Sequence, residues 1–187
     1  EKIPVVYEPT KYRTIKEIFI KNTIKYAKKE FVLEKFDSKK KFETKTYEDF
    51  RNDVIGLGTG LEDLIKLKGK RVAIVGQTTY HWYVSYMTML CSEGIAVPVD
   101  KELPENEFIN VINRARADIV IYHGRKKELI AKTKSSLNTV KYFIEMNSDE
   151  EYNKETKTMG IERIIADGKK IAEKDKDSFL NISIDPE

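Results

Sequence analysis

Residues 67–107 read LKGKRVAIVGQTTYHWYVSYMTMLCSEGIAVPVDKELPENE, and this stretch determines the predicted fold. Residues 71–76 form a short β-branched run between glycines, which is typical of a strand buried on both faces. Residues 80–92 are apolar around most of a helical circumference, so protein should cover this helix on nearly all sides. Residues 95–99 form a second apolar run, and a connection of this length permits only a crossover. The stretch therefore predicts a βαβ unit with two parallel strands.

The residues before this unit predict two helices and a hairpin. Thr14 with Glu17, and Thr46 with Asp49, have the three-residue spacing of a capping box, which marks the start of a helix. The expected elements are a surface helix at 11–29, a hairpin with strands at 31–36 and 41–46, and a helix that follows Thr46.

The residues after the unit continue the alternation of strands and helices. Pro104 suits the first turn of a helix, and residues 147–158 are polar without periodicity, which predicts a mobile loop. The other expected elements are strands at 118–122 and 139–144 and helices at 126–135 and 160–174. The fold class is thus α/β: a parallel sheet of about four strands with helices on both faces and a small N-terminal hairpin beside it.

Composition excludes several functional classes. The 34 basic and 31 acidic side chains leave a net charge of only +3, which is too small for a nucleic-acid-binding surface. No apolar run reaches the roughly 18 residues that a transmembrane helix needs. Cys91 is the single cysteine, so an internal disulfide is excluded and a reducing, cytoplasmic location is expected.

Two glycine-containing segments are candidates for phosphate-binding loops. Residues 56–60 read GLGTG, but their third glycine comes one place early for a dinucleotide fingerprint and they follow a helix start, so a helix that tolerates glycines is favoured. Residues 76–79 read GQTT, follow a strand and open a helix, so their amides could face an anion. One glycine is a weak signal, and a structural turn is the preferred interpretation.

The remaining reactive side chains predict no catalytic or metal site. His81 and His123 are distant in sequence and have no cysteine or carboxylate at metal-ligand spacing. Cys91 lies in an apolar helix, where packing explains it better than nucleophilic catalysis. The carboxylates at a strand end and over a helix start suit the helix macrodipole without any catalytic role; they are Asp100, Glu102, Glu105 and Glu107.

The central stretch resembles one enzyme family. The residues that carry the resemblance are GKRVAI at 69–74, Trp82, Gly94 and VPVDKELPENE at 97–107. They are similar to the N-terminal region of adenylate-forming acyl-CoA synthetases, and DKELP at 100–104 resembles the bacterial long-chain fatty acid-CoA ligases. In the helix-opening loop the family commonly has Asn and Glu before the tryptophan, whereas this chain has Gln77 and His81.

The resemblance implies a function for a longer protein. Family members convert a carboxylate and ATP into an acyl-adenylate and pyrophosphate, then form acyl-CoA and AMP, so ATP, Mg²⁺, CoA and a fatty acid are the implied ligands. The family's phosphate-gripping loop would begin just after residues 185–187, which read DPE. The chain is therefore expected to be a truncated N-terminal subdomain that is inactive alone, with no catalytic, cofactor-binding or metal-binding residue, and with the rest of its chain and a second copy in a homodimer as partners.

The expected organisation is a lead-in with a helix at 1–30 and one α/β subdomain at 31–187. Within the subdomain we expect the hairpin at 31–46, βα units at 47–146, the polar loop at 147–158 and the C-terminal helix at 160–175. Two alternatives stay open: a self-contained flavodoxin-like domain that binds a nucleotide or flavin at the carboxyl ends of its strands, and a protein-interaction domain that uses an exposed apolar helix face.

Overall fold

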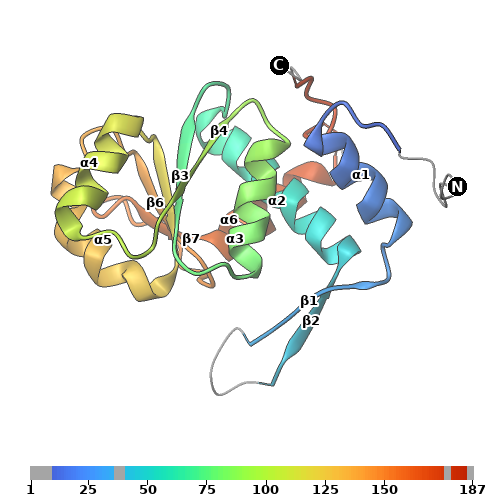
Figure 1. The fold of residues 1–187 in the computed structure, drawn as a ribbon, viewed down its shortest axis with the longest axis horizontal. Coiled ribbons are helices and arrows are strands. Elements are labelled where there is room, and N and C mark those ends of the chain that lie inside the picture. The colour runs from blue at the N-terminus through green and yellow to red at the C-terminus, as the bar shows by residue number, and fades with distance from the viewer. Residues whose placement is uncertain (1–9, 36–40, 175–177, 185–187) are drawn as a thin grey trace, which may run out of the picture.

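The structure is a computed structural model that describes residues 10–35, 41–174 and 178–184. A five-stranded sheet in the order β4-β3-β5-β6-β7 forms its centre, and all neighbouring strands are parallel (Figure 1). The strands are β3 (Arg71–Val75), β4 (Ile95–Val99), β5 (Ile119–Tyr122), β6 (Tyr142–Glu145) and β7 (Thr158–Gly160). The predicted α/β class is confirmed.

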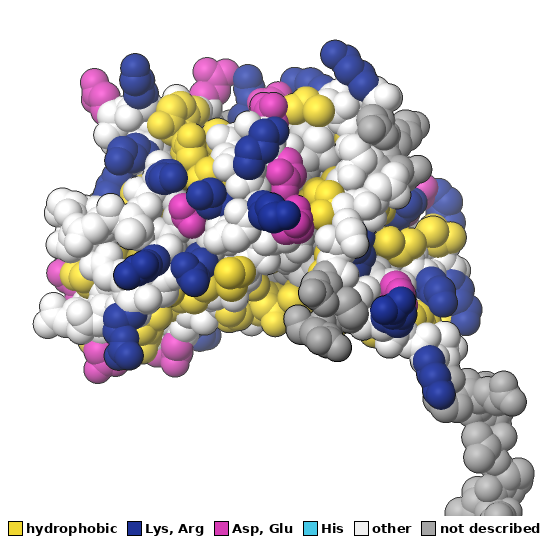
Figure 2. All heavy atoms as spheres, turned by 90° about the horizontal axis from the view of Figure 1, so that it is seen from above, with side chains coloured by type: hydrophobic (Ala, Val, Ile, Leu, Met, Phe, Trp, Pro, Cys, Tyr) yellow, Lys and Arg dark blue, Asp and Glu magenta, His cyan; other side chains and the backbone are white. Residues whose placement is uncertain are grey.

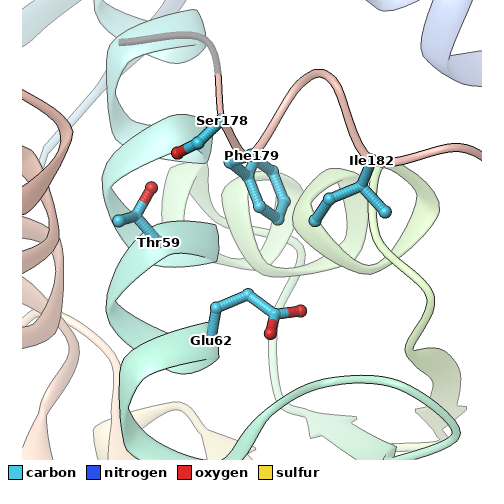
Figure 3. A pocket seen from close by; sticks show the side chains of 5 residues that line it. All are labelled: Thr59, Glu62, Ser178, Phe179 and Ile182. Carbon is cyan, nitrogen blue, oxygen red and sulfur yellow. The ribbon is translucent and has the colours of Figure 1, made fainter. Parts of the chain in front are cut away.

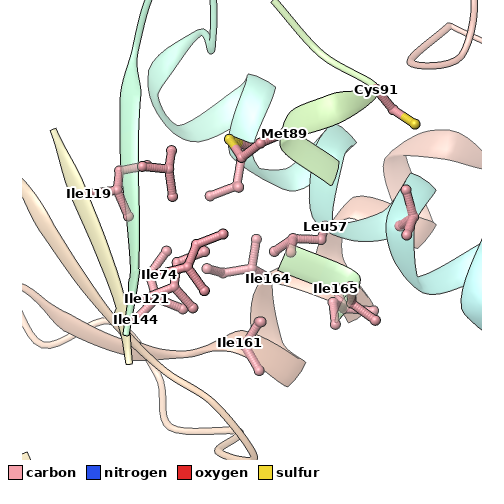
Figure 4. Packing of buried hydrophobic residues seen from close by; sticks show 14 of the residues in the cluster. Leu57, Ile74, Met89, Cys91, Ile119, Ile121, Ile144, Ile161, Ile164 and Ile165 are labelled. Carbon is pink, nitrogen blue, oxygen red and sulfur yellow. The ribbon is translucent and has the colours of Figure 1, made fainter. Parts of the chain in front are cut away.

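Helices cover both faces of this sheet, as the sequence predicted. On one face lie α2 (Tyr47–Ile65), α3 (Tyr80–Leu90) and α6 (Ile161–Ala172), whose apolar side chains form one core (Figure 4). On the other face lie α4 (Glu105–Ala115) and α5 (Lys127–Thr133), the latter between the short 3-10 helices η1 (Gly124–Lys126) and η2 (Lys134–Ser136).

The strand residues alternate between these two cores. In β3, Val72 and Ile74 belong to the core beneath α2, α3 and α6, whereas Ala73 and Val75 belong to the core beneath α4 and α5. All four side chains are at most 1% exposed, as expected for a strand that is covered on both faces.

A separate antiparallel hairpin precedes the sheet. It consists of β1 (Glu30–Glu34) and β2 (Glu43–Thr46), and it follows helix α1 (Ile15–Lys25). The predicted hairpin is confirmed, while its turn at residues 36–40 lies outside the described residues.

The two predicted capping boxes have different outcomes. At α2, Thr46 and Asp49 form the complete reciprocal pair. At α1, the Thr14 hydroxyl accepts a hydrogen bond from the Glu17 amide at 3.2 Å, but the Glu17 carboxylate accepts from the Arg13 amide at 2.8 Å. The prediction of a reciprocal pair at α1 is therefore wrong, because the Glu17 carboxylate binds the Arg13 amide instead of the Thr14 amide.

The sheet has one strand more than predicted. Strand β7 contains three residues and pairs with β6 through Phe143, Ile144 and Glu145. Its sequence, TMG, has neither an apolar run nor an alternation, so backbone pairing with β6 rather than a hydrophobic pattern defines it. The predicted loop at residues 147–158 is therefore wrong at its last residue, because Thr158 lies in strand β7.

Glycines let α2 and α6 approach closely. A Cβ atom on Gly168 of α6 would lie 2.6 Å from the Gly60 nitrogen and closer still to the Gly56 oxygen, whereas real Cβ atoms essentially never come within 3.0 Å. Gly56 and Gly60 stand four residues apart on one face of α2. Gly56 and Gly60 therefore serve helix packing, and the predicted helix through residues 56–60 is confirmed.

The surface carries mixed charge. Basic and acidic side chains are interspersed over the face shown in Figure 2, with hydrophobic side chains between them. Among the described residues, no helix combines the length and the apolarity required to cross a lipid bilayer.

Candidate functional site

The strand order reverses between β3 and β5, which lie side by side in the sheet: the chain passes from β3 to β4 on one side and from β5 to β6 on the other. The chain leaves β3 toward α3 on one face and leaves β5 toward α5 on the other. In open parallel sheets, ligands bind preferentially in the crevice outside the carboxyl ends of two such strands. The segments that follow β3 and β5 are therefore the first place to look for a binding site.

Gly76 and His123 meet at this position. The His123 amide donates to the Val75 carbonyl at 3.0 Å, and a Cβ on Gly76 would lie 3.1 Å from the His123 nitrogen and closer to its Cβ. Gly76 also has a φ of 138°, in the region that favours glycine. Glycine is thus required here by conformation and by close approach, which explains it without a ligand.

The amino end of α3 already faces a carboxylate. The backbone N–H of Tyr80, the first residue of α3, donates to Glu34 Oε2 at 2.6 Å, and Glu34 comes from strand β1. A carboxylate at a helix amino terminus is stabilised by the macrodipole. The anion that the sequence suggested for residues 76–79 is therefore supplied by the chain itself in this structure.

His123 is a neutral hydrogen-bonding residue at the edge of the crevice. Its Nδ1 accepts from the Arg125 amide at 3.2 Å, which places the proton on Nε2. Burial, and then the nearby Arg125 charge, hold the pKa of His123 below its usual value. The neutral form is therefore favoured around pH 7.

His81 is the buried histidine, and two oxygens face its ring. It is 1% exposed, its Nε2 lies 2.9 Å from Glu162 Oε1, and its Nδ1 contacts Asn147 Oδ1. The hydrogen bond to His81 holds the pKa of Glu162 below its usual value. The sequence showed no sign of a carboxylate near His81, because Glu162 is distant in the chain and only the tertiary fold brings the two side chains together.

A cluster of three hydrogen-bonded polar side chains consists of Tyr80, the neighbour of His81 in the chain, together with Asp53 and Lys169. The Tyr80 hydroxyl donates to Asp53 Oδ2 at 2.5 Å, and the Lys169 ammonium donates to the other Asp53 oxygen. Burial and the Asp53 charge both raise the pKa of Tyr80. Tyr80, Asp53 and Lys169 come from α3, α2 and α6, so the group ties the three helices of one face together.

The other candidate residues agree with their structural interpretations. Cys91 is fully buried, and burial raises the pKa of its thiol to about 12, so a thiolate is disfavoured. Asp100 accepts from the Glu102 amide at 2.8 Å in a turn, and Glu105 and Glu107 lie in the first turn of α4. Within the described ranges, no three His, Cys, Asp or Glu side chains gather closely enough to hold a metal ion.

A pH dependence follows from the Glu162–His81 pair. Because the pKa of Glu162 is lowered on folding, its contribution to stability is present above its ordinary value of 4.5 and is lost as pH falls through the lowered pKa. Glu162→Gln should therefore be less stable than the native chain at about pH 7, and the difference should shrink toward about pH 3.5. Urea unfolding at both pH values measures this; a difference that is independent of pH would contradict it. The effect should be modest because the Glu162 side chain is 47% exposed.

Comparison with known proteins gives a family and a fold. A sequence model of the AMP-binding enzyme family matches residues 21–182. Among solved structures, the anthranilate CoA ligase AuaEII in complex with anthranoyl-AMP superposes with a TM-score of 0.70 at 17% identity, over 88% of this chain and 28% of that one. No curated protein sequence matches this chain.

Two further solved structures are similar. Coronafacic acid ligase from Pectobacterium brasiliense has a TM-score of 0.71 at 18% identity, over 82% of this chain and 29% of that one. A candidate long-chain-fatty-acid CoA ligase from Rhodopseudomonas palustris has a TM-score of 0.66 at 17% identity, over 81% of this chain and 36% of that one. This chain thus spans about a third or less of these relatives, and its fold matches part of theirs. Since the family model covers most of its length, the chain belongs to the AMP-binding enzyme family.

Proposed function

We propose that this chain is the N-terminal part of an adenylate-forming acyl-CoA ligase. The family match over residues 21–182 carries the proposal. In the proposed reaction a carboxylate oxygen attacks the α-phosphorus of ATP and displaces pyrophosphate, and the thiol of CoA then takes the acyl group and releases AMP. Charge must be neutralised as the carboxylate approaches the nucleotide, which requires Mg²⁺ and basic or amide donors.

We propose no site for ATP or Mg²⁺ among the described residues. They contain no group of three carboxylate, histidine or cysteine side chains for a metal, and Glu34 is hydrogen-bonded to the first amide of α3. We therefore assign no step of the reaction to a residue of this chain. Its proposed role is a rigid scaffold: the two-sided core fixes the carboxyl edge of the sheet, against which the rest of the protein would place its reactive loops.

The proposed substrate is a fatty acid, and the resemblance of residues 100–104 to the long-chain ligases supports it. The fold does not distinguish a fatty acid from other carboxylate substrates, because structures named for anthranilate and for coronafacic acid superpose on this chain as well as the long-chain ligase does. A homodimer and a cytoplasmic location belong to the same proposal.

Pyrophosphate exchange tests the proposed activity. A protein that continues past Glu187 in the same reading frame should exchange labelled pyrophosphate into ATP in the presence of a fatty acid, whereas the 187-residue chain should neither exchange nor bind ATP in calorimetry. Exchange with an aryl acid instead would retain the ligase and replace the substrate. Tight ATP or flavin binding by the 187-residue chain would overturn the proposal in favour of a self-contained nucleotide-binding domain.

A further inference from the structure

Helix α3 is the least polar helix of the chain. It contains no Asp, Glu, Lys or Arg, whereas each of the other α-helices has three or more of these side chains. A helix of this composition is normally covered by protein on nearly all sides, as the sequence analysis also predicted.

One side of α3 is not covered by the described part of the chain. The residues of α3 that are not buried are all aromatic or aliphatic, namely Trp82, Tyr83, Tyr86, Met87 and Leu90. Their spacing places them together on one side of the helix, which we call the outward face of α3. Tyr83 is 43% exposed, and the Trp82 and Tyr86 rings stack with their centroids 5.1 Å apart. A continuous apolar surface without charge is typical of an interaction site.

The neighbouring edge of the sheet is open but does not favour a further strand. Among the described strands, β4 pairs only with β3. The Ile95 amide donates to the Lys70 carbonyl at 2.8 Å on the β3 side, so the backbone groups of Ala96 and Pro98 point to the open edge. Because proline has no N–H, this edge is poorly suited to strand addition. Side-chain packing on the outward face of α3 is therefore the expected mode of contact.

The carboxyl-terminal segment shows how this chain covers a neighbouring helix. A Cβ on Gly58 of α2 would lie 2.5 Å from Phe179 Cε1 and closer to other ring atoms, so glycine lets the Phe179 ring pack against the helix. Figure 3 shows the segment passing α2 with the Phe179 side chain beside it. Phe179 is only 2% exposed as a result.

The same segment brings the chain close to α3. Lys16 of α1 donates to the Ile182 carbonyl at 2.5 Å, and Lys16 also lies near Cys91, the residue that follows α3. The last described residues therefore lie near the carboxyl end of α3, on the face of the sheet that α2, α3 and α6 cover. Any continuation of the chain starts from the side on which the outward face of α3 is open.

The lengths of the similar structures and the chemistry of α3 together define the occupant. This chain spans only 28% of the anthranilate CoA ligase structure and 29% of coronafacic acid ligase, so most of a ligase of that size would lie outside it. We propose that the outward face of α3 is the docking surface for the part of the ligase that follows residue 187, an inference that rests on the proposed function. An anionic membrane is a poorer match, because it attracts basic side chains and α3 has none.

Hydroxyl-radical labelling with mass spectrometry tests this inference without any variant. The 187-residue chain is compared with a longer protein that continues past Glu187 in the same reading frame. Labelling of Trp82, Tyr83 and Tyr86 should fall at least about fivefold in the longer protein, because docked aromatic side chains leave the solvent. Tyr152 is the matched control, since it is 45% exposed against 43% for Tyr83 and lies in the loop before β7, at the opposite edge of the sheet from β4. Its labelling should not change.

Pyrophosphate exchange by the longer protein separates this inference from the proposed function. Exchange without protection of the outward face of α3 would overturn the docking surface and retain the ligase. Protection without exchange would support the docking surface and overturn the ligase. Protection that already develops in the 187-residue chain as its concentration rises would assign the face to a second copy and overturn the inference.

A charge placed on the docking surface gives a second test. Tyr83→Glu should lower the thermal midpoint of the longer protein by about 5 °C or more, because docking would bury an unpaired carboxylate. In the 187-residue chain the same substitution should change the midpoint by no more than about 2 °C, since position 83 is half exposed there. Tyr152→Glu is the control and should leave both midpoints unchanged. Equal shifts of the two proteins with Tyr83→Glu would refute the docking surface.

Discussion

Gly168→Ala should destabilise the protein by about 3 kcal/mol or more, the largest effect that we expect from a single methyl group. The new Cβ would lie 2.6 Å from the Gly60 nitrogen and 2.9 Å from the Gly56 carbonyl carbon. These are backbone atoms inside α2, so no side-chain rotation can relieve the clash and the two helices must separate. Urea unfolding followed by circular dichroism measures the change.

The sign of this effect separates packing from helix propensity. Alanine is a better helix former than glycine by about 1 kcal/mol, so propensity alone predicts that Gly168→Ala stabilises α6. The matched control is Ala166→Gly on the exposed side of the same helix, which should cost only about 1 kcal/mol. A Gly168→Ala variant that is as stable as the native chain would show that α2 and α6 do not approach as closely as described.

The glycines illustrate what sequence patterns can and cannot predict. The helix through Gly56, Gly58 and Gly60 was predictable, because the apolar residues around them keep helical spacing. The reason for Gly56 and Gly60 was not predictable, since Gly168 is more than a hundred residues away and only tertiary packing brings it to them. Local periodicity predicts which face of a helix is buried, but it does not identify the neighbour that requires a glycine.

The polar contacts show the same limit more strongly. The buried strands and the alternation of β and α segments were predictable from short apolar runs, because burial of such runs is the main determinant of this fold. Strand β7 lacked that signal, and so did the pairing of His81 with Glu162. For the candidate site, the glycine after β3 was predictable, whereas the carboxylate that faces α3 comes from the hairpin and could not be inferred from spacing.

Asp53→Ala should cost about 3 kcal/mol, the second-largest effect that we expect. Asp53 is 7% exposed and accepts from both the Tyr80 hydroxyl and the Lys169 ammonium. Its removal leaves the fully buried Tyr80 hydroxyl without this acceptor. Lys169 contributes less to the loss, because its side chain is 45% exposed and can be solvated by water. Urea unfolding at neutral pH gives the value, and the exposed Asp63→Ala on the same helix should stay within about 0.5 kcal/mol of the native chain.

A double-mutant cycle measures the coupling between the Asp53 carboxylate and the Tyr80 hydroxyl. Tyr80→Phe alone removes the donor and leaves Asp53 with Lys169, so it should cost about 1 kcal/mol. Each single variant already breaks the Tyr80–Asp53 hydrogen bond, so the cost of the double variant should be smaller than the sum of the two single costs by about 1 kcal/mol. Strictly additive costs would mean that Asp53 and Tyr80 do not interact, and that Asp53 stabilises the three-helix face through Lys169 alone.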